Sequence, residues 1–426
     1  MIIYVIKHGD SIYSVAKQYG VTPEALISLN QLANPTQLVM GQSLVVPQGQ
    51  RVYSVRPGDT LYSIARQYGA TPESIMGENP DIEAGGRVFP GQIIVIPPPG
   101  KQQAATEVNG YTFTGSKIDV VTAALPSLTY LSIFSYQVKA DGSLDTIDDT
   151  KWITLARNNN VAPVMVITNI KSTGGFDSEI GHSVLVNGQA QTNLINNVST
   201  IMKQKNYYAL NVDFEYIFPF DRQSYNQFLS SITERMHSMG YMVFTAVAPK
   251  LSASQTGLLY EAHDYPAQGA IVDRVILMTY EWGYLSGPPQ AVAPLNQVKR
   301  VLDYATTVIP RSKILLGIPN YGYDWVLPYV KGTKATTFSN VEAVARAARN
   351  NAEIKYDAAA QSPYYNYYDD QKRQHIVWFE DARSIAQKLN LVEEYHLAGI
   401  SYWTIELPFP QNLVVLNSMY NVKKVI

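Results

Sequence analysis

The stretch Tyr208-Ala209-Leu210-Asn211-Val212-Asp213-Phe214-Glu215-Tyr216 reads as a short buried strand that ends in two carboxylates. Alternation along a strand places Asn211, Asp213 and Glu215 on one face and the apolar side chains on the other. Carboxylates at the end of an apolar strand are costly to bury unless they are paired or take part in chemistry. The stretch alone therefore leaves two interpretations open, a structural salt bridge and a catalytic pair.

The chain around this stretch alternates short β-rich apolar runs with helical segments from about residue 108 onward, which is typical of an α/β fold with a βα barrel. Eight candidate strands follow this pattern: 111–114, 130–136, 162–168, 209–214, 242–248, 274–279, 314–318 and 399–403. We therefore predict a TIM (β/α)8 barrel. One insertion, 326–380, falls between strands seven and eight and contains a helix near 340–350 and Tyr-rich hairpin pieces at 364–368 and 375–379.

Catalytic groups of such a barrel lie where its strands end. Those positions carry one acid pair, several tyrosines and three tryptophans: Phe134, Tyr136, Asn169, Asp213, Glu215, Tyr280, Glu281, Trp282, Tyr321, Tyr323, Asp324, Trp325, Tyr402 and Trp403. Aromatic faces stack on sugar rings, and the chain contains 30 tyrosines. The convergence favours a sugar site over chance clustering.

Four of these strand ends resemble the motifs of glycoside hydrolase family 18. They read Asn211-Val212-Asp213-Phe214-Glu215 at strand four, Met278-Thr279-Tyr280-Glu281 at strand six, Gly317-Ile318-Pro319-Asn320-Tyr321-Gly322 at strand seven and Tyr402-Trp403 at strand eight. Tyr208 and Asn211 replace the family's first two aspartates, and Glu281 replaces the aspartate after Tyr280. The catalytic pair is intact, but a neutral Asn211 cannot raise the pKa of Asp213 as a carboxylate would.

The resemblance implies a retaining N-acetylglucosaminidase in which the substrate's own 2-acetamido oxygen attacks the anomeric carbon. Glu215 is then the general acid, Asp213 orients the acetamido group and Tyr280 donates to its carbonyl oxygen. Trp403 forms the apolar floor, although core packing remains an alternative for Tyr280 and Trp403. Further substrate contacts are expected from these residues: Asn211, Asn169, Glu281, Trp282, Tyr321, Tyr323, Asp324 and Trp403. Neither a cofactor nor a metal is expected.

The first hundred residues contain a repeat with a period of 49, in which 4–20 aligns with 53–69. Each unit reads as strand, helix, helix, strand. Asp10 and Asp59 are placed as N-caps of the first helices, and Gly20 and Gly69 as left-handed stops. Thr-Pro pairs at 22–23 and 71–72 start the second helices.

The two units resemble LysM modules, at 2–48 and 51–98, followed by a linker at 99–107 and the barrel domain at 108–426. The resemblance implies that they bind glycans containing N-acetylglucosamine, in a groove between the loop opening the first helix and the loops at about 30–34 and 79–82. The implied contacts are Gly9, Asp10, Ser11, Ile12 and Asn30 in the first module and Gly58, Asp59, Thr60, Leu61 and Asn79 in the second. A purely structural doublet is the alternative.

Within the family, the segments 280–284, 286–291 and 321–325 together with the LysM pair resemble the cortex-fragment-lytic enzymes of endospore formers. This implies hydrolysis of spore-cortex peptidoglycan fragments during germination, by a protein made in the mother cell and assembled onto the spore, with coat proteins as candidate partners. The alternatives are a chitinase and a catalytically silent glycan-binding coat protein. Retention of Glu215 favours an enzyme.

Composition narrows the remaining classes. A net charge of −2 with 16% charged residues gives no electrostatic reason to expect nucleic acid or an anionic membrane as partner. The absence of cysteine excludes disulfides and thiolate chemistry. The chain opens into a strand-like 2–6 without a basic leader, so no cleaved export signal is expected. Glu261-Ala262-His263-Asp264 is a local cluster for which a capped loop is favoured over a metal site.

Overall fold

The protein is described by a computed structural model covering residues 1–426 except 33, 48–50, 80, 81, 83, 84 and 97–102. The chain forms two compact units. One contains Met1–Ala104 with Pro410–Asn421, and the other contains Ala105–Phe409 with Val422–Ile426.

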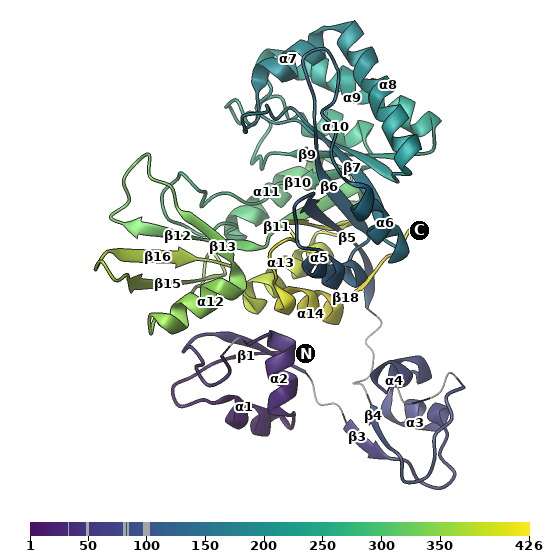
Figure 1. Ribbon diagram of the computed structural model, residues 1–426, viewed down its shortest axis with the longest axis vertical. Helices are drawn as coiled ribbons and strands as arrows, with labels where there is room; N and C mark the ends of the chain where they lie inside the picture. The colour runs from purple at the N-terminus through teal and green to yellow at the C-terminus, as the bar shows by residue number, and fades with distance from the viewer. Residues whose placement is uncertain (33, 48–50, 80–81, 83–84, 97–102) are drawn as a thin grey trace. The chain divides into compact units, whose positions relative to one another are not determined.

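Eight parallel strands form the closed barrel (Figure 1). They are β5 (Ala104–Phe113), β6 (Tyr130–Gln137), β7 (Ala162–Thr168), β8 (Ala209–Asp213), β9 (Met242–Val247), β10 (Arg274–Leu277), β11 (Ile314–Pro319) and β17 (Gly399–Trp403). Each strand pairs in parallel with its neighbour, and β17 pairs back with β5, where Tyr402 lies opposite Gly110. The predicted TIM barrel is confirmed, and β18 (Tyr420–Val422) is added beside β5.

Helices follow the strands around the barrel. They are α5 (Ile118–Ala124), α6 (Thr150–Asn158), α7 (Ser178–Val186), α8 (Gly188–Lys205), α9 (Arg222–Ser238), α10 (Tyr265–Ile271), α11 (Leu295–Val308) and α13 (Ala382–Glu394). A further helix, α14 (Pro410–Met419), belongs to the unit that contains Met1–Ala104. Short 3-10 turns occur at Leu125–Ser127, Pro219–Asp221 and Arg311–Lys313. The barrel interior is filled by apolar side chains from its strands, including Tyr111, Val164, Phe244, Ile276 and Leu315.

The first barrel strand begins earlier than the sequence predicted. Residues 104–107, assigned to the linker, belong to β5, while 99–102 lie outside the described residues. Glu107 is buried and receives hydrogen bonds from Arg274 through Nε (2.6 Å) and Nη2 (2.7 Å). Gly399 of β17 lies so close that a Cβ would meet the Glu107 carbonyl oxygen at 1.8 Å. Residues 104–107 were assigned to the linker because Ala-Ala-Thr-Glu has no strand pattern of its own. In the fold the charge of Glu107 is paired with that of Arg274.

The predicted insertion is a five-stranded antiparallel sheet with one helix, seen on the left of Figure 1. It consists of β12 (Tyr321–Leu327), β13 (Thr336–Ser339), α12 (Asn340–Arg349), β14 (Lys355–Asp357), β15 (Ser362–Tyr368) and β16 (Gln374–Trp378). It starts at Tyr321 instead of residue 326, because β12 follows β11 after a single intervening residue. The residues read as a barrel-strand end are therefore the first strand of the insertion.

Both N-terminal modules have the predicted βααβ order. The first contains β1 (Ile2–Val5), α1 (Ile12–Tyr19), α2 (Pro23–Asn30) and β2 (Ser43–Val46), and the second contains β3 (Arg51–Ser54), α3 (Leu61–Tyr68), α4 (Pro72–Glu78) and β4 (Ile93–Ile96). In each, the two strands pair antiparallel. Gly20 and Gly69 adopt the predicted left-handed conformation, with φ of 66° and 67°.

The N-caps of the first helices are Ser11 and Thr60, so the prediction of Asp10 and Asp59 is wrong by one residue. Each cap forms a reciprocal capping box with a serine three residues on. Asp10 instead accepts hydrogen bonds from the Tyr4 hydroxyl and the Lys7 backbone N–H, both at 2.7 Å. Asp59 does the same in the second module. The aspartate therefore fixes the loop that precedes the helix.

Candidate active site

A cavity of about 640 Å³ opens where the barrel strands end. It is lined by Tyr111, Phe113, Phe134, Ile170, Gly175, Phe176, Asp213, Glu215, Tyr216, Ala248, Pro249, Leu259, Tyr260, Met278, Tyr280, Glu281, Tyr284 and Trp403. Five residues predicted from the sequence meet here: Asp213, Glu215, Tyr280, Glu281 and Trp403. The structure thus brings together groups that lie up to 190 residues apart (213 to 403) in the chain.

Asp213 is the last residue of β8 and only 4% exposed. Its Oδ1 receives no hydrogen bond from any described residue. Burial raises the pKa of Asp213 to about 7, because the anion is removed from water without a compensating donor. Burial therefore raises the pKa of Asp213, as a carboxylate at position 211 was expected to do, and the neutral Asn211 does not prevent this rise.

Glu215 follows the strand on a backbone that is held from both sides. The Asn169 side chain accepts a hydrogen bond from Glu215 N–H (3.0 Å) and donates one to its carbonyl oxygen (2.8 Å). The neighbouring Phe214 carbonyl accepts a bond from Nε2 of buried His263 (3.0 Å), whose Nδ1 accepts from the Ala248 N–H. Asn169, predicted as a substrate contact, is not among the cavity-lining residues and positions Glu215 instead.

The pKa of Glu215 is raised well above its ordinary value, first by burial and then by the charges of Asp213 and Glu281. The negative charge of either carboxylate makes it harder for the other carboxyl group to lose its proton, so the pair still holds a proton near neutral pH. The pair can therefore supply a proton at neutral pH, which is what a general acid requires.

Asn211 lies below this pair, fully buried on β8. Its amide nitrogen donates to the Tyr111 hydroxyl at 2.6 Å, and its Oδ1 has no partner among the described residues. Asn211 is not a cavity-lining residue, and a substrate contact by Asn211 stays a prediction. Asn211 orients Tyr111, which does line the cavity and which the sequence reasoning missed.

The apolar side of the cavity is built around Trp403 at the end of β17. Its indole packs edge to face against Phe134 (5.0 Å between centroids), Tyr111 (5.1 Å) and Phe113 (5.7 Å). Tyr280 lines the same cavity with 9% exposure. Burial raises the pKa of Tyr280 well above its usual range, so its hydroxyl stays a hydrogen-bond donor.

Glu281 is directed to the cavity by a left-handed backbone conformation, φ 67°. The hydroxyls of Tyr321 and Tyr323 both donate to its Oε1, the latter at 2.9 Å. Surrounding protein atoms raise the pKa of Glu281, and the two hydrogen bonds oppose that effect. Tyr321 and Tyr323 were predicted to bind substrate, yet neither lines the cavity, and both hold Glu281.

The family model of glycosyl hydrolases family 18 matches residues 108–407, which contain every residue of this cavity. The chain belongs to glycosyl hydrolases family 18. The LysM domain model matches twice, at 4–47 and 53–97, so the enzyme domain follows two LysM domains.

Some relatives match along the whole chain. The chain is 43% identical over 428 residues to the cortical fragment-lytic enzyme of Bacillus subtilis (strain 168), covering 100% of this chain and 99% of the relative. The spore cortex-lytic enzyme SleL of Bacillus megaterium QM B1551 has a similar structure, with a TM-score of 0.85, 39% identity and coverage of 100% and 99%. A chitinase from Chromobacterium violaceum matches with a TM-score of 0.70 and 25% identity, over 74% of this chain and 99% of its own.

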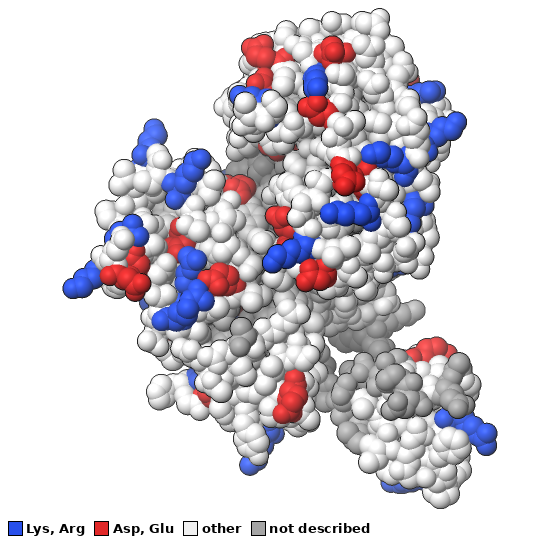
Figure 2. All heavy atoms as spheres, viewed as in Figure 1, with Lys and Arg blue, Asp and Glu red and all other residues white. Residues whose placement is uncertain are grey.

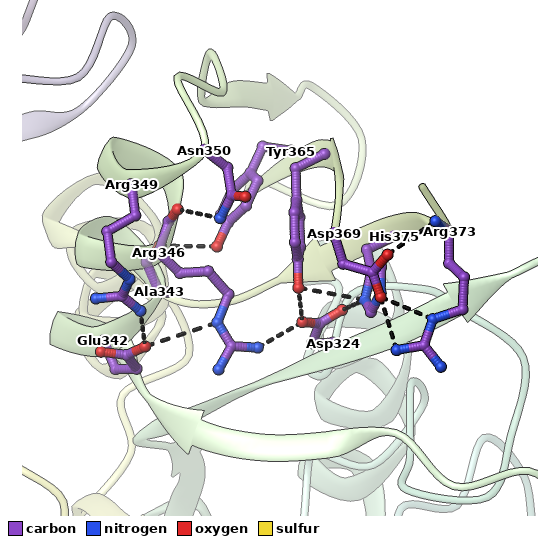
Figure 3. Close-up of polar contacts among 11 residues, drawn as sticks. Asp324, Glu342, Ala343, Arg346, Arg349, Asn350, Tyr365, Asp369, Arg373 and His375 are labelled. Carbon is purple, nitrogen blue, oxygen red and sulfur yellow. Dashed lines mark hydrogen bonds and ion pairs between the residues drawn. The ribbon is translucent and has the colours of Figure 1, made fainter. Parts of the chain in front are cut away.

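Asp324 is not among the residues that line the family 18 cavity, and its prediction as a substrate contact stays a prediction. It projects into the insertion (Figure 3), where its carboxylate meets Arg346 Nη1 (2.5 Å), the Tyr367 hydroxyl (2.6 Å) and His375 Nδ1 (2.7 Å). Alternation along β12 explains this position, because Tyr321 and Tyr323 face Glu281 while Asp324 faces the other way. Trp282 is also absent from the cavity lining, and its backbone pairs with Val292.

In the LysM domains, the side chains of Asn30 and Asn79 form hydrogen bonds within the fold. Asn30 donates to the Leu26 and Val45 carbonyls (2.9 and 2.8 Å) and accepts from the Val45 N–H (2.7 Å). Asn79 makes the equivalent bonds in the second domain. Ile12 and Leu61 are buried in the domain cores. These four were predicted as glycan contacts, and their side chains are occupied by the fold.

The remaining LysM predictions stand as predictions. Gly9, Ser11, Gly58 and Thr60 are exposed, and Asp10 and Asp59 are half-buried beside them. The opposite wall of the predicted groove includes residues 33, 80 and 81, which lie outside the described residues.

Several cavity residues were missed by the sequence analysis: Tyr111, Phe176, Tyr216, Tyr260 and Tyr284. Two of them had a signal, since Tyr216 directly follows Glu215 and Tyr284 ends the segment 280–284. His263 was correctly assigned to a capped loop, in which Asp264 accepts from the Ala267 N–H at the start of α10. Within the described parts of the chain, no group of three or more acids and histidines is placed to hold a metal ion.

The surface carries no single dominant charge on the face shown in Figure 2, where acidic and basic side chains lie interspersed among many uncharged ones. Of the helices that the structure describes, none combines the length and the apolar character needed to cross a membrane.

Proposed function

We propose that this family 18 enzyme is a retaining N-acetylglucosaminidase that uses substrate-assisted catalysis on peptidoglycan fragments of the spore cortex. The observation that carries this proposal is the burial of Asp213 beside Glu215 in one cavity. An enzyme nucleophile must be ionised, and burial raises the pKa of Asp213 to about 7. At neutral pH only about half of the Asp213 side chains are then ionised, which makes Asp213 a weaker nucleophile than an ordinary aspartate and favours the substrate's acetamido oxygen for this role.

The positions of these side chains support the following reaction. Glu215 donates its proton to the glycosidic oxygen as that bond breaks, and the acetamido carbonyl oxygen bonds to the anomeric carbon. Asp213 accepts a hydrogen bond from the acetamido N–H, and the Tyr280 hydroxyl donates to the acetamido oxygen. The Glu215 carboxylate then takes a proton from water, whose oxygen attacks the same carbon and restores the acetamido group with retained configuration.

Cortex as the substrate rests on the names of the full-length relatives and on the LysM pair. Two glycan-binding domains on one chain raise the effective concentration of the enzyme domain near an insoluble polymer. Action in the spore, in a protein made in the mother cell without a cleaved signal and with coat proteins as candidate neighbours, belongs to the same proposal. The C. violaceum structure makes chitin oligomers the substrate to compare.

The test is product analysis. Purified full-length protein is given cortex fragments and, separately, chitin oligomers, and mass spectrometry identifies the new reducing ends. N-acetylglucosamine ends from cortex, formed faster than from chitin, are expected. Muramic acid ends, or faster cleavage of chitin, would contradict the proposal.

A pair of variants separates catalysis from binding. Glu215→Gln should lose about 10² to 10⁴ in rate, the usual contribution of a general acid, and still sediment with insoluble peptidoglycan. Glu394→Gln, at an exposed carboxylate that pairs with Lys299 on the barrel exterior, is the control and should keep full activity. An active Glu215→Gln variant would refute the acid assignment.

A further inference from the structure

The ionisable side chains that line the cavity carry negative charge when they ionise, and none carries positive charge. Its lining residues include Asp213, Glu215 and Glu281, and none of the lining residues is lysine, arginine or histidine. Two lysines adjoin cavity-lining residues in the sequence, but their ammonium groups contact other parts of the protein. Lys250 donates from Nζ to the His263 carbonyl (3.0 Å), and Lys171 Nζ lies 3.5 Å from the Asp177 carboxylate. The cavity therefore offers no cation to a bound anion.

Glu281 is the one acid of the cavity lining that has no role in the proposed reaction. Both tyrosine hydroxyls that hold it donate to Oε1. None of the described residues donates to its Oε2, which leaves this oxygen to accept from a ligand hydroxyl. Burial raises the pKa of Glu281, and the two donors on one oxygen oppose that rise by stabilising the ionised form of the carboxyl group. The Glu281 carboxylate is thus held in place, where it can accept a hydrogen bond from a ligand hydroxyl and repel a ligand carboxylate.

The sugars of peptidoglycan differ in charge as well as in size. N-acetylglucosamine is neutral, whereas N-acetylmuramic acid carries a carboxylate on its 3-O-lactyl group when that group bears no peptide. We propose that the cavity selects the uncharged sugar by electrostatic exclusion and that Glu281, clamped by Tyr321 and Tyr323, is a specificity-determining residue. This inference rests on the proposed function, since it concerns the sugar that occupies the same site.

The size of the effect follows from Coulomb's law. Two like charges about 7 Å apart at an effective dielectric constant near 20 repel enough to lower binding about fiftyfold, and solvent at the cavity mouth reduces this to about tenfold. Exclusion of a competitor by an unfavourable charge is a common source of specificity.

Three aryl disaccharides test the inference on the full-length protein. They differ only in the sugar next to the fluorogenic leaving group, which is N-acetylglucosamine, N-acetylmuramic acid or the lactyl amide of N-acetylmuramic acid. The acid and the amide have the same size, so their ratio of kcat/KM reports charge alone. We expect the wild-type enzyme to cleave the amide about tenfold faster than the acid.

Glu281→Gln should bring that ratio close to one, whatever its effect on the absolute rates, and the control Glu394→Gln should leave the ratio unchanged. Equal rates for acid and amide in the wild type, an uncleaved amide, or a ratio that survives Glu281→Gln would each overturn the charge selection. Failure to cleave the N-acetylglucosamine compound would instead refute the proposed function, so the two failures are distinguishable.

Discussion

Replacing Asp213 with asparagine should stabilise the barrel at neutral pH while it abolishes function. The carboxyl group is 4% exposed, and burial raises its pKa to about 7 from an ordinary value of 3.8. The gap is about 3 pH units, and each unit corresponds to about 1.36 kcal/mol. Wild-type protein therefore loses about 4 kcal/mol of unfolding free energy that the neutral amide retains.

The pH dependence has a definite sign. Between pH 4 and 7 the folded state holds a proton that the unfolded chain releases, so the stability of the wild type falls as pH rises through this window. Below pH 4 Asp213 is protonated in both states, and the variant and wild type should be equally stable. The advantage of Asp213→Asn should grow from there to its full value above pH 7.

Urea unfolding followed by tryptophan fluorescence measures this difference in the barrel unit alone. All five tryptophans lie at 152, 282, 325, 378 and 403, and the LysM domains contain none. Asp145→Asn is a matched control, because Asp145 is exposed and pairs with Lys139 at the surface. That variant should change stability by less than about 1 kcal/mol. Equal stability of Asp213→Asn and wild type at pH 8 would refute the claim that Asp213 is held in the fold at an energetic cost.

Three further predictions address other parts of the molecule. Glu107→Gln should lower the unfolding free energy of the barrel by about 3–5 kcal/mol, because it leaves the largely buried Arg274 side chain, 19% exposed, without its charge partner; an unchanged urea midpoint would contradict this. Asn30→Ala should speed hydrogen exchange of the Val45 amide and weaken sedimentation with peptidoglycan, with hydrolysis of soluble fragments unchanged; full retention on peptidoglycan would argue against a role for the first LysM domain. Tyr280→Phe should cut kcat/KM about 10²-fold, as expected for loss of one donor at a developing charge, and a fully active variant would assign Tyr280 to packing.

The barrel and the acid pair were predictable because their signals are local. Apolar runs of strand length recur between helical segments, and Asp213, Glu215 and Tyr280 sit at fixed offsets from strand ends. The same reasoning located the insertion and its helix. What the periodicity could not show is that Tyr321 starts a new sheet one residue after β11 ends.

The sequence could not show the contacts that these side chains make with segments distant in the chain. Asn30 and Asn79 recur in both repeats, which suggested binding, but each joins a helix to a strand 15 or 16 residues away. Tyr321 and Tyr323 meet Glu281 across about 40 residues. Asp324 lies on the same strand as Tyr321 and Tyr323, but its side chain points to the opposite face. In each case the residue type was informative, and the partner could be identified only from the fold.

The central claim is that the nucleophile belongs to the substrate, and a series of aryl chitobiosides with zero to three fluorines on the reacting N-acetyl group tests it most directly. Fluorine withdraws electron density from the acetamido carbonyl oxygen without a large change in size. If that oxygen attacks the anomeric carbon, kcat/KM should fall at each added fluorine. A value of kcat/KM that does not change with fluorine number would show that the acetamido oxygen is not the nucleophile, and it would contradict the roles of Asp213 and Tyr280 in orienting that group.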